Sequence, residues 1–160
     1  MKRAILALTL LFGCAASTPA PTTAPATIQT APRKALQIKL VTIYVDDQEK
    51  ALRFYTDVLG FEKKDDYSNE GFRWLSVTDG ANELQLALNN NPPAKAFQQA
   101  MYQQSQPAIM FYTSSLASEL ARIEGKGATI KMPLTDVTMA LIAQVDDGCG
   151  NLVQITQLER

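Results

Sequence analysis

The order of predicted elements repeats along this sequence, and the repetition constrains the fold more than any single motif does. Each copy consists of one strand, one helix and three further strands, as judged from period-two alternation and from helical spacing of apolar residues. The first copy covers residues 40–45, 46–60, 61–67, 72–78 and 82–88. The second covers residues 108–113, 114–125, 128–132, 137–145 and 152–157. The pattern predicts an α+β fold built from two βαβββ modules.

Local signals agree with this division. Asp46 or Asp47 is placed to cap the first helix, and Gly60 is placed to end it in a left-handed conformation. Between the two copies, Pro92-Pro93 can start a connecting helix over residues 94–104. The sequence therefore predicts one helix in each module and a third helix that joins them.

The N-terminal part predicts export and tethering. Lys2 and Arg3 precede a short apolar run that is well under the roughly 20 residues needed to span a bilayer. The following Leu11-Phe12-Gly13-Cys14 resembles the lipobox of bacterial lipoproteins. The resemblance implies a signal peptide over residues 1–13 and a lipidated Cys14. An ordinary secretory signal with an incidental cysteine is the alternative.

Residues 14–35 are rich in Thr, Pro and Ala and are expected to form a disordered tether. Ala15 directly after the cysteine implies, by the same resemblance, the periplasmic face of the outer membrane. We therefore expect a membrane-anchored protein of the cell envelope.

Charge and composition exclude some functions. The net charge is −1 and no basic run occurs, so nucleic acid is not an expected partner. The chain has no histidine, which removes the commonest general base and the commonest metal ligand. Cys149 lies in a turn-rich stretch without a base to activate it. We expect Cys149 to be structural or vestigial.

Two stretches resemble the vicinal oxygen chelate superfamily, which includes glyoxalase I, extradiol dioxygenases and bleomycin-resistance proteins. They are residues 45–61, which contain FYTDVLGF, and residues 147–154, DGCGNLVQ. The resemblance implies that residues 36–160 form two βαβββ modules whose curved sheets make a cup, often completed by a second subunit. It also implies a divalent metal that chelates two neighbouring oxygens of the substrate.

The metal positions of that family do not carry metal ligands here. Aligning on the strand–helix motif places them at Leu40, Gln85, Ala108 and Gln154. Leucine and alanine offer no lone pair, and two neutral amides are too few ligands for a transition metal. We therefore expect no metal and no other cofactor. A shifted register, or a site that uses Glu83, is the alternative.

With those positions facing inward, the strands have two unlike surfaces. The aliphatic or aromatic surface suits a sheet face under helices: Val41, Ile43, Val45, Leu84, Leu86, Leu88, Ile109, Phe111, Val153 and Ile155. The mixed surface suits a small-ligand pocket: Leu40, Thr42, Tyr44, Glu83, Gln85, Ala87, Met110, Tyr112, Leu152, Gln154 and Thr156. A merely solvated face, or a face buried against a second subunit, is the alternative reading of the mixed surface.

The candidate ligand-binding residues belong to the mixed surface or lie next to it: Thr42, Tyr44, Trp74, Glu83, Gln85, Tyr112 and Gln154. Glu83 acts as a base if its pKa is raised, or else pairs with a cation, for which Arg73 is a candidate. Trp74 joins this surface if Arg73 turns outward, and then either stacks on a flat ligand or packs into the core.

The expected function is binding of a small molecule in a metal-free cup, by analogy with the bleomycin-resistance members. One alternative is a metal-dependent lyase or isomerase of glyoxalase type, and another is a non-catalytic interaction module of the envelope. Catalytic residues are not assigned, and a homodimer is expected from the resemblance alone.

Overall fold

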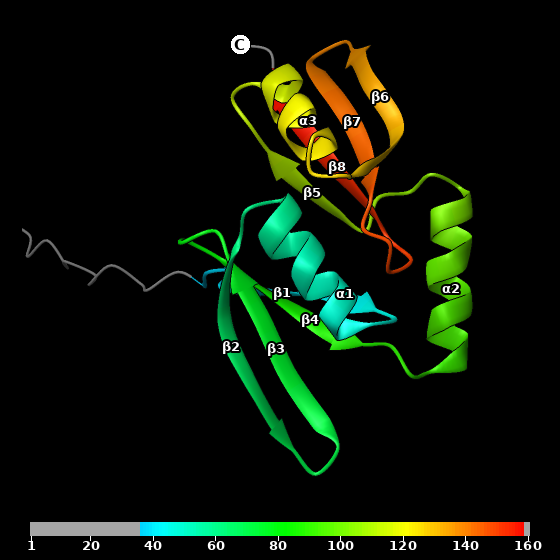
Figure 1. The fold of residues 1–160 in the computed structure, drawn as a ribbon. Coiled ribbons are helices and arrows are strands. Elements are labelled where there is room, and N and C mark those ends of the chain that lie inside the picture. The colour runs from blue at the N-terminus through cyan, green and yellow to red at the C-terminus, as the bar shows by residue number, and fades with distance from the viewer. Residues whose placement is uncertain (1–35, 159–160) are drawn as a thin grey trace, which may run out of the picture. The chain divides into compact units, whose positions relative to one another are not determined.

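In each module the first strand pairs in parallel with the last strand. The computed structural model describes residues 36–158. In the first module the elements are β1 (Leu40–Val45), α1 (Gln48–Arg53), the π-helical turn η1 (Phe54–Val58), β2 (Glu62–Asn69), β3 (Phe72–Thr78) and β4 (Glu83–Leu88). The strand order is β1-β4-β3-β2, with β1 and β4 parallel (Figure 1).

The second module repeats this arrangement after the connecting helix. Its elements are α2 (Pro92–Gln103), which joins the modules, then β5 (Ile109–Tyr112), α3 (Leu116–Glu124), β6 (Thr129–Val137), β7 (Ala140–Asp146) and β8 (Leu152–Leu158). The strand order is β5-β8-β7-β6, and the two curved sheets have a cup-like arrangement. The predicted α+β fold of two βαβββ modules is confirmed.

The predicted signal peptide, Cys14 and the tether lie outside the described residues. Within residues 36–158, no helix combines the length and the apolar character that are needed to cross a membrane.

The first helix begins and ends where its capping residues predict. The Asp47 carboxylate accepts hydrogen bonds from the backbone N–H groups of Glu49 and Lys50 at 2.9 and 3.0 Å, which lowers the pKa of Asp47. Gly60 follows η1 with a φ of +89°, a conformation that a glycine adopts without strain. Of the two residues expected to cap the N-terminus of this helix, Asp47 forms the cap and Asp46 does not.

The boundary between β6 and β7 differs from the prediction. A short strand over residues 128–132 and a longer one over 137–145 were expected, but β6 extends to Val137 and the turn falls at Thr138 and Met139. Pro133 suggested a break, yet β6 is an edge strand with an irregular register around this proline. An edge strand tolerates the missing N–H of proline, and no Gly or Asn marks the real turn.

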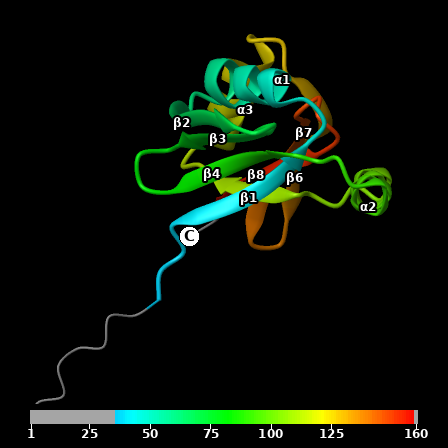
Figure 2. The same cartoon turned by 90° about the horizontal axis from the view of Figure 1, so that it is seen from below.

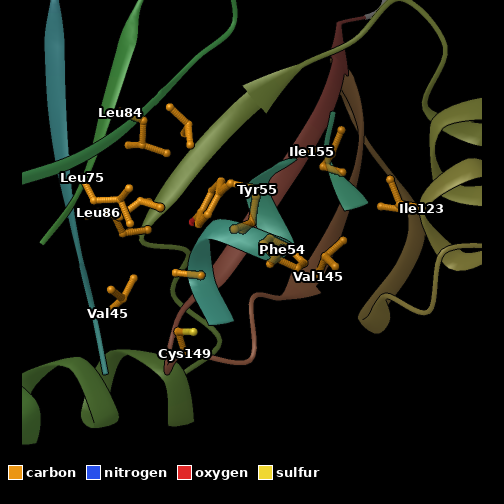
Figure 3. Packing of buried hydrophobic residues seen from close by; sticks show 14 of the residues in the cluster. Val45, Phe54, Tyr55, Leu75, Leu84, Leu86, Ile123, Val145, Cys149 and Ile155 are labelled. Atoms are coloured by element: carbon orange, nitrogen blue, oxygen red, sulfur yellow. The ribbon is translucent and has the colours of Figure 1, made fainter. Parts of the chain in front are cut away.

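Both modules contribute to one hydrophobic core on the helical side of the sheets. Figure 3 shows Phe54 and Tyr55 between the first-module leucines and Val145 of the second module. The ring centroids of Phe61 and Phe111, one from each module, are 5.1 Å apart. In Figure 2, α1 and α3 lie on the same side of the strands. The opposite faces of the sheets are therefore left without helical cover.

Polar contacts reinforce the packing between the modules. The Arg122 guanidinium on α3 donates to the backbone carbonyls of Val58 and Leu59 at 2.9 and 3.0 Å. These carbonyls lie at the C-terminal end of η1, where backbone acceptors lack helical partners. Arg122 therefore ties α3 to the end of the first-module helix.

The connecting helix α2 is attached differently, since none of its residues is buried. In Figures 1 and 2 it lies at the periphery, apart from α1 and α3. The Gln98 amide donates to the Tyr44 carbonyl and to Asn151 Oδ1, each at 2.9 Å. The Tyr102 hydroxyl donates to the Asp146 carboxylate at 2.6 Å. Hydrogen bonds, rather than buried apolar contacts, hold α2.

Two buried or partly buried tyrosines allow the core to be tested. The Tyr55 hydroxyl is fully buried and has no hydrogen-bond partner among residues 36–158, whereas the Tyr102 hydroxyl has a carboxylate partner. We expect Tyr55→Phe to raise the free energy of unfolding by about 1 kcal/mol, because an unsatisfied buried hydroxyl is removed. We expect Tyr102→Phe to lower it by about 1 kcal/mol, because a charge-assisted bond is lost.

Urea unfolding of both variants measures the two changes. Equal destabilisation by Tyr55→Phe and Tyr102→Phe would contradict the prediction, because it would mean that the Tyr55 hydroxyl is hydrogen-bonded in solution.

Candidate functional site

The uncovered face of β1 and β4 carries the polar and aromatic residues that the alternation predicted. The Thr42 hydroxyl donates to the Gln85 amide oxygen at 2.8 Å, so these neighbours in the parallel register share one face. On the other face, Ile43, Leu84 and Leu86 are buried in the core. The expected orientation is thus observed for these residues, whereas Val41 and Leu88, which were also expected on the covered face, are each 44% exposed.

A hollow of about 370 Å³ in the first module is lined by residues of this face and also by Gln48, Arg73 and Leu88, which belong to the helical side. It is lined by Thr42, Tyr44, Gln48, Gly71, Phe72, Arg73, Gln85, Ala87, Leu88 and Asn90. Three of the predicted ligand-binding residues, Thr42, Tyr44 and Gln85, therefore lie together. The Gln85 side chain is largely buried while Tyr44 and Phe72 are more than half exposed. We call this hollow the sheet hollow.

Trp74 lies on the same face of the sheet as Gln85, because Ser76, two residues along β3, is the register partner of Gln85. Its ring stacks on Tyr67 of β2, with centroids 6.2 Å apart and an interplanar angle of 9°. Trp74 is half-buried and Tyr67 is 57% exposed. The pair extends the aromatic surface along the β2–β3 hairpin.

Arg73 points to the helical side and does not pair with Glu83, so that expectation was wrong. Its guanidinium binds Asp66 at 2.8 Å and Glu49 of α1 at 2.6 Å, and it lowers the pKa of Asp66 to about 2. The reason is strand alternation: Arg73 has the parity of the buried Leu75.

Glu83 pairs with Lys64 of β2 instead, with Nζ and Oε2 2.5 Å apart. The hydrogen bond from Lys64 lowers the pKa of Glu83, so this carboxylate is an anion at neutral pH. A general base at neutral pH needs a raised pKa. The geometry therefore favours an ion pair over a catalytic base at this position.

The remaining predicted residues are not gathered in the sheet hollow. Tyr112 and Glu83 line a separate hollow of about 390 Å³ together with Val41 and Met110. Gln154 lies beside Met110 in the register of β5 and β8, and its amide donates to the Met110 sulfur at 3.3 Å. The seven predicted residues are therefore divided: Thr42, Tyr44 and Gln85 line the sheet hollow, Trp74 belongs to the aromatic pair, Glu83 and Tyr112 line the separate hollow, and Gln154 lies on β8.

The mixed face of the second module is less open than expected. Leu152 and Thr156 are 3% and 5% exposed, although the alternation placed them on the uncovered face. Tyr112, in contrast, is 67% exposed. The accessible part of this face is therefore concentrated on β5.

The family's metal positions do not provide a metal site. Leu40 and Ala108 have no donor atoms, and the amide oxygen of Gln85 already accepts the bond from Thr42. No group of three or more Cys, Asp or Glu side chains in residues 36–158 is arranged to hold a metal ion. The residues present do not fit the divalent ion of the family, and no catalytic step through a metal follows from them.

Cys149 is fully buried and unpaired among the described residues. Burial, and then the neighbouring carboxylate of Asp147, raise the pKa of the Cys149 thiol to about 12. A thiol with such a pKa is not a nucleophile at neutral pH. Its place in the core fits a structural residue.

Comparison with known proteins defines the class. The sequence profile of the Glyoxalase/Bleomycin resistance protein/Dioxygenase superfamily matches residues 37–155. The chain belongs to this superfamily. It is also 39% identical over 127 residues to the uncharacterized protein YurT of Bacillus subtilis (strain 168), a match that covers 76% of this chain and 99% of YurT.

Solved structures show the same fold. UcmS2 superposes with a TM-score of 0.67 at 22% identity, covering 76% of this chain and 98% of UcmS2. TnmS3, an antibiotic binding protein from Streptomyces sp. CB03234, superposes with a TM-score of 0.62 at 24% identity, covering 79% of this chain and 98% of TnmS3. The architecture is therefore the glyoxalase-like fold.

The contribution of α2 to the surface around Thr42 and Tyr44 was not predicted from the sequence. Phe97, Gln98 and Met101 line a further cavity that also includes Thr42 and Tyr44 of the sheet hollow. Spacings of three and four residues between these positions were a visible signal of one helix face. The sequence alone does not show that this face of the helix lies toward β1.

The charge state of Glu83 leads to a prediction about pH. In Lys64→Met we expect the pKa of Glu83 to rise toward its ordinary value, because the charge-assisted hydrogen bond is lost. Since the folded pKa lies below the unfolded value, the pair stabilises the fold above the unfolded pKa. That stabilisation is lost as the pH falls through the folded pKa.

Titration of the Glu83 carboxyl carbon by NMR measures this shift. Lys63→Met is the matched control, because Lys63 pairs with Asp66 and not with Glu83. An unchanged Glu83 pKa in Lys64→Met would show that the ion pair does not form in solution.

Proposed function

We propose that this domain binds a small organic molecule in the sheet hollow, without a metal and without transforming it. The observation that carries the proposal is the arrangement of Thr42 and Gln85, a hydroxyl and a largely buried amide, beneath the exposed rings of Tyr44 and Phe72. A concave surface with a few convergent polar groups and aromatic walls is typical of small-ligand sites. TnmS3, which has the same fold, is an antibiotic binding protein, and this likeness supports the same class of function.

An enzymatic role has less support. Glyoxalase-type chemistry needs a metal, and the four family positions offer at most two neutral amides. The one carboxylate on the mixed surface is held as an anion by Lys64. Binding without turnover requires neither a metal nor a base, and it is therefore the function that this donor set supports best.

We further propose that the site is completed in a homodimer. Met110 and Tyr112 are 54% and 67% exposed on the uncovered face of β5, and Tyr44 is 55% exposed on β1. Exposed apolar groups on a concave sheet face favour a partner surface. Sedimentation of the domain over a range of concentrations checks this proposal, and a monomer throughout that range would contradict it.

The same exposed residues favour a second candidate function, a non-catalytic interaction module of the cell envelope. Its ligand would be a different protein rather than a small molecule. The exposure of Tyr112 far from the sheet hollow is the observation that favours it.

Ligand binding can be measured through Trp74, the single tryptophan of the chain. We expect at least one compound in a panel of antibiotics and metabolites to change Trp74 fluorescence and raise the melting temperature, also after treatment with a chelator. Gln85→Ala is expected to lower the affinity for that compound by about tenfold, because one hydrogen bond is lost and Thr42 is left without its acceptor.

Gln103→Ala is the matched control, since Gln103 is exposed at the end of α2. No response to any compound, combined with stable co-purification of one envelope protein, would favour the interaction module. Loss of binding on chelation, or a stoichiometric metal in the purified protein, would contradict the metal-free site.

We propose that the domain is anchored to the envelope through Cys14, at the periplasmic face of the outer membrane. The support is the sequence Leu11-Phe12-Gly13-Cys14 after two basic residues and a short apolar run. Stable anchoring requires two or more acyl chains, which lipidation at this cysteine would provide.

For the full chain expressed in a bacterium, Cys14→Ser is expected to abolish labelling by a fatty acid and to release the protein from the membrane fraction. Cys149→Ser is the control and should keep both properties, because Cys149 is buried in the folded domain. Membrane association that survives Cys14→Ser would contradict the lipid anchor.

A further inference from the structure

A cavity of about 350 Å³ lies between α2, β1 of the first sheet and the loops that precede β5 and β8. We call it the α2 cavity. It is lined by Thr42, Ile43, Tyr44, Asn89, Ala94, Phe97, Gln98, Met101, Tyr102, Gln106, Pro107, Ala108, Gly150 and Asn151. None of these residues carries a charge at neutral pH, and the polar ones are amides and hydroxyls. The cavity therefore suits a neutral group.

One face of α2 forms the outer wall of this cavity. Ala94, Phe97, Gln98 and Met101 lie at positions i, i+3, i+4 and i+7, which share one side of a helix. Phe97 is nevertheless 67% exposed, and no residue of α2 is buried. An apolar group that entered the cavity would cover this exposed surface, and burial of apolar area is favourable by roughly 25 cal/mol per Å².

The wall is held in place without filling the space. The Gln98 amide donates hydrogen bonds to the Tyr44 carbonyl and to Asn151, and the Asn89 amide donates to Gln98 at 3.0 Å. Gly150 leaves room for this side chain, since a Cβ atom there would lie 3.1 Å from the Gln98 amide nitrogen. The helix is thereby positioned by hydrogen bonds, which leaves its apolar face available to a ligand.

A neighbouring hollow, which shares Gln98, Tyr102 and Gly150 with the α2 cavity, has a different character. It has a volume of about 510 Å³ and is lined by Asp46, Lys50, Lys95 and Asp146, among other residues. Lysine and aspartate side chains keep their charges in water, so this hollow favours solvent or ions. Of these two hollows beside α2, the α2 cavity is therefore the one that suits an apolar group.

We infer that the α2 cavity is a second compartment of the ligand site and takes a neutral aromatic or branched aliphatic group. This inference rests on the proposed function, because Thr42 and Tyr44 line both the cavity and the sheet hollow. The ligand is then an amphipathic molecule. Its polar part contacts Thr42 and Gln85, and its apolar part lies against Phe97 and Met101.

The size of the cavity agrees with this division. Sites for whole drug-sized ligands have volumes of roughly 300–1,000 Å³, and the α2 cavity is at the lower end of that range. A group of one or two rings fits it, and the rest of a larger molecule must lie outside. The sheet hollow, with about 370 Å³, adjoins it at Thr42 and Tyr44.

The test uses 2-naphthol as a neutral two-ring probe and protein labelled at the Ala and Met methyl groups. Titration is expected to shift the NMR signals of Ala94, Met101 and Ala108, which line the cavity. Ala94→Phe is expected to lower the affinity for 2-naphthol by about tenfold or more, because the new ring occupies the cavity. Ala96→Phe is the matched control, since Ala96 is exposed and does not line the cavity.

A third variant separates this inference from the proposed function. Ala87→Leu is expected to leave naphthol binding unchanged, because Ala87 lines the sheet hollow and not the α2 cavity. Binding of naphthol in the cavity without any ligand from the panel would support the compartment and count against the proposed function.

Three results would overturn the inference. The first is naphthol binding that Ala94→Phe and Ala96→Phe change equally. The second is a panel ligand that binds at the sheet hollow while Ala94→Phe has no effect on it. The third is that the NMR signals of the cavity residues shift with protein concentration and do not respond to naphthol. That result would show that a second copy of the chain fills the α2 cavity.

Discussion

Burial of one face of β1 and β4 determines what the opposite face can do. Ile43, Val45, Leu84 and Leu86 are nearly inaccessible to solvent in the shared core. Each such side chain contributes roughly 1.5–3 kcal/mol, whereas the Thr42–Gln85 hydrogen bond contributes about 1 kcal/mol. The aliphatic residues therefore set the orientation of the strands, and the polar residues face outward because the alternation leaves them no other side.

A shift of either strand by one residue would exchange the two faces completely. Such a shift of β1 would turn Thr42 toward the core and expose Ile43 and Val45, and the same shift of β4 would turn Gln85 toward the core and expose Leu84 and Leu86. The proposed ligand surface and the hydrophobic core are thus two consequences of one register. For this reason the residues on the uncovered face of β1 and β4 are fixed by the same register as the core.

The molecule combines a rigid core with a lightly attached helix. Aromatic rings from both modules and the Arg122 contacts join α1, η1 and α3 into one body. The helix α2 has no buried residue and depends on Gln98 and Tyr102. Elements with few buried contacts open at the lowest free-energy cost, and ligand-binding segments are commonly of this kind. The cavity therefore lies where the fold can adapt to a ligand.

The sequence by itself determined the duplicated modules, the Gly60 end of the first helix and the two faces of β1 and β4, and it reduced the N-cap to Asp46 or Asp47. These features are local, because capping and alternation depend on residues a few positions apart. Only the tertiary structure decided that Glu83 pairs with Lys64, that β6 continues past Pro133, and that Phe97 and Met101 face β1. These three features depend on which segments, distant in the sequence, come together in space. Residue spacing within the sequence does not determine those contacts.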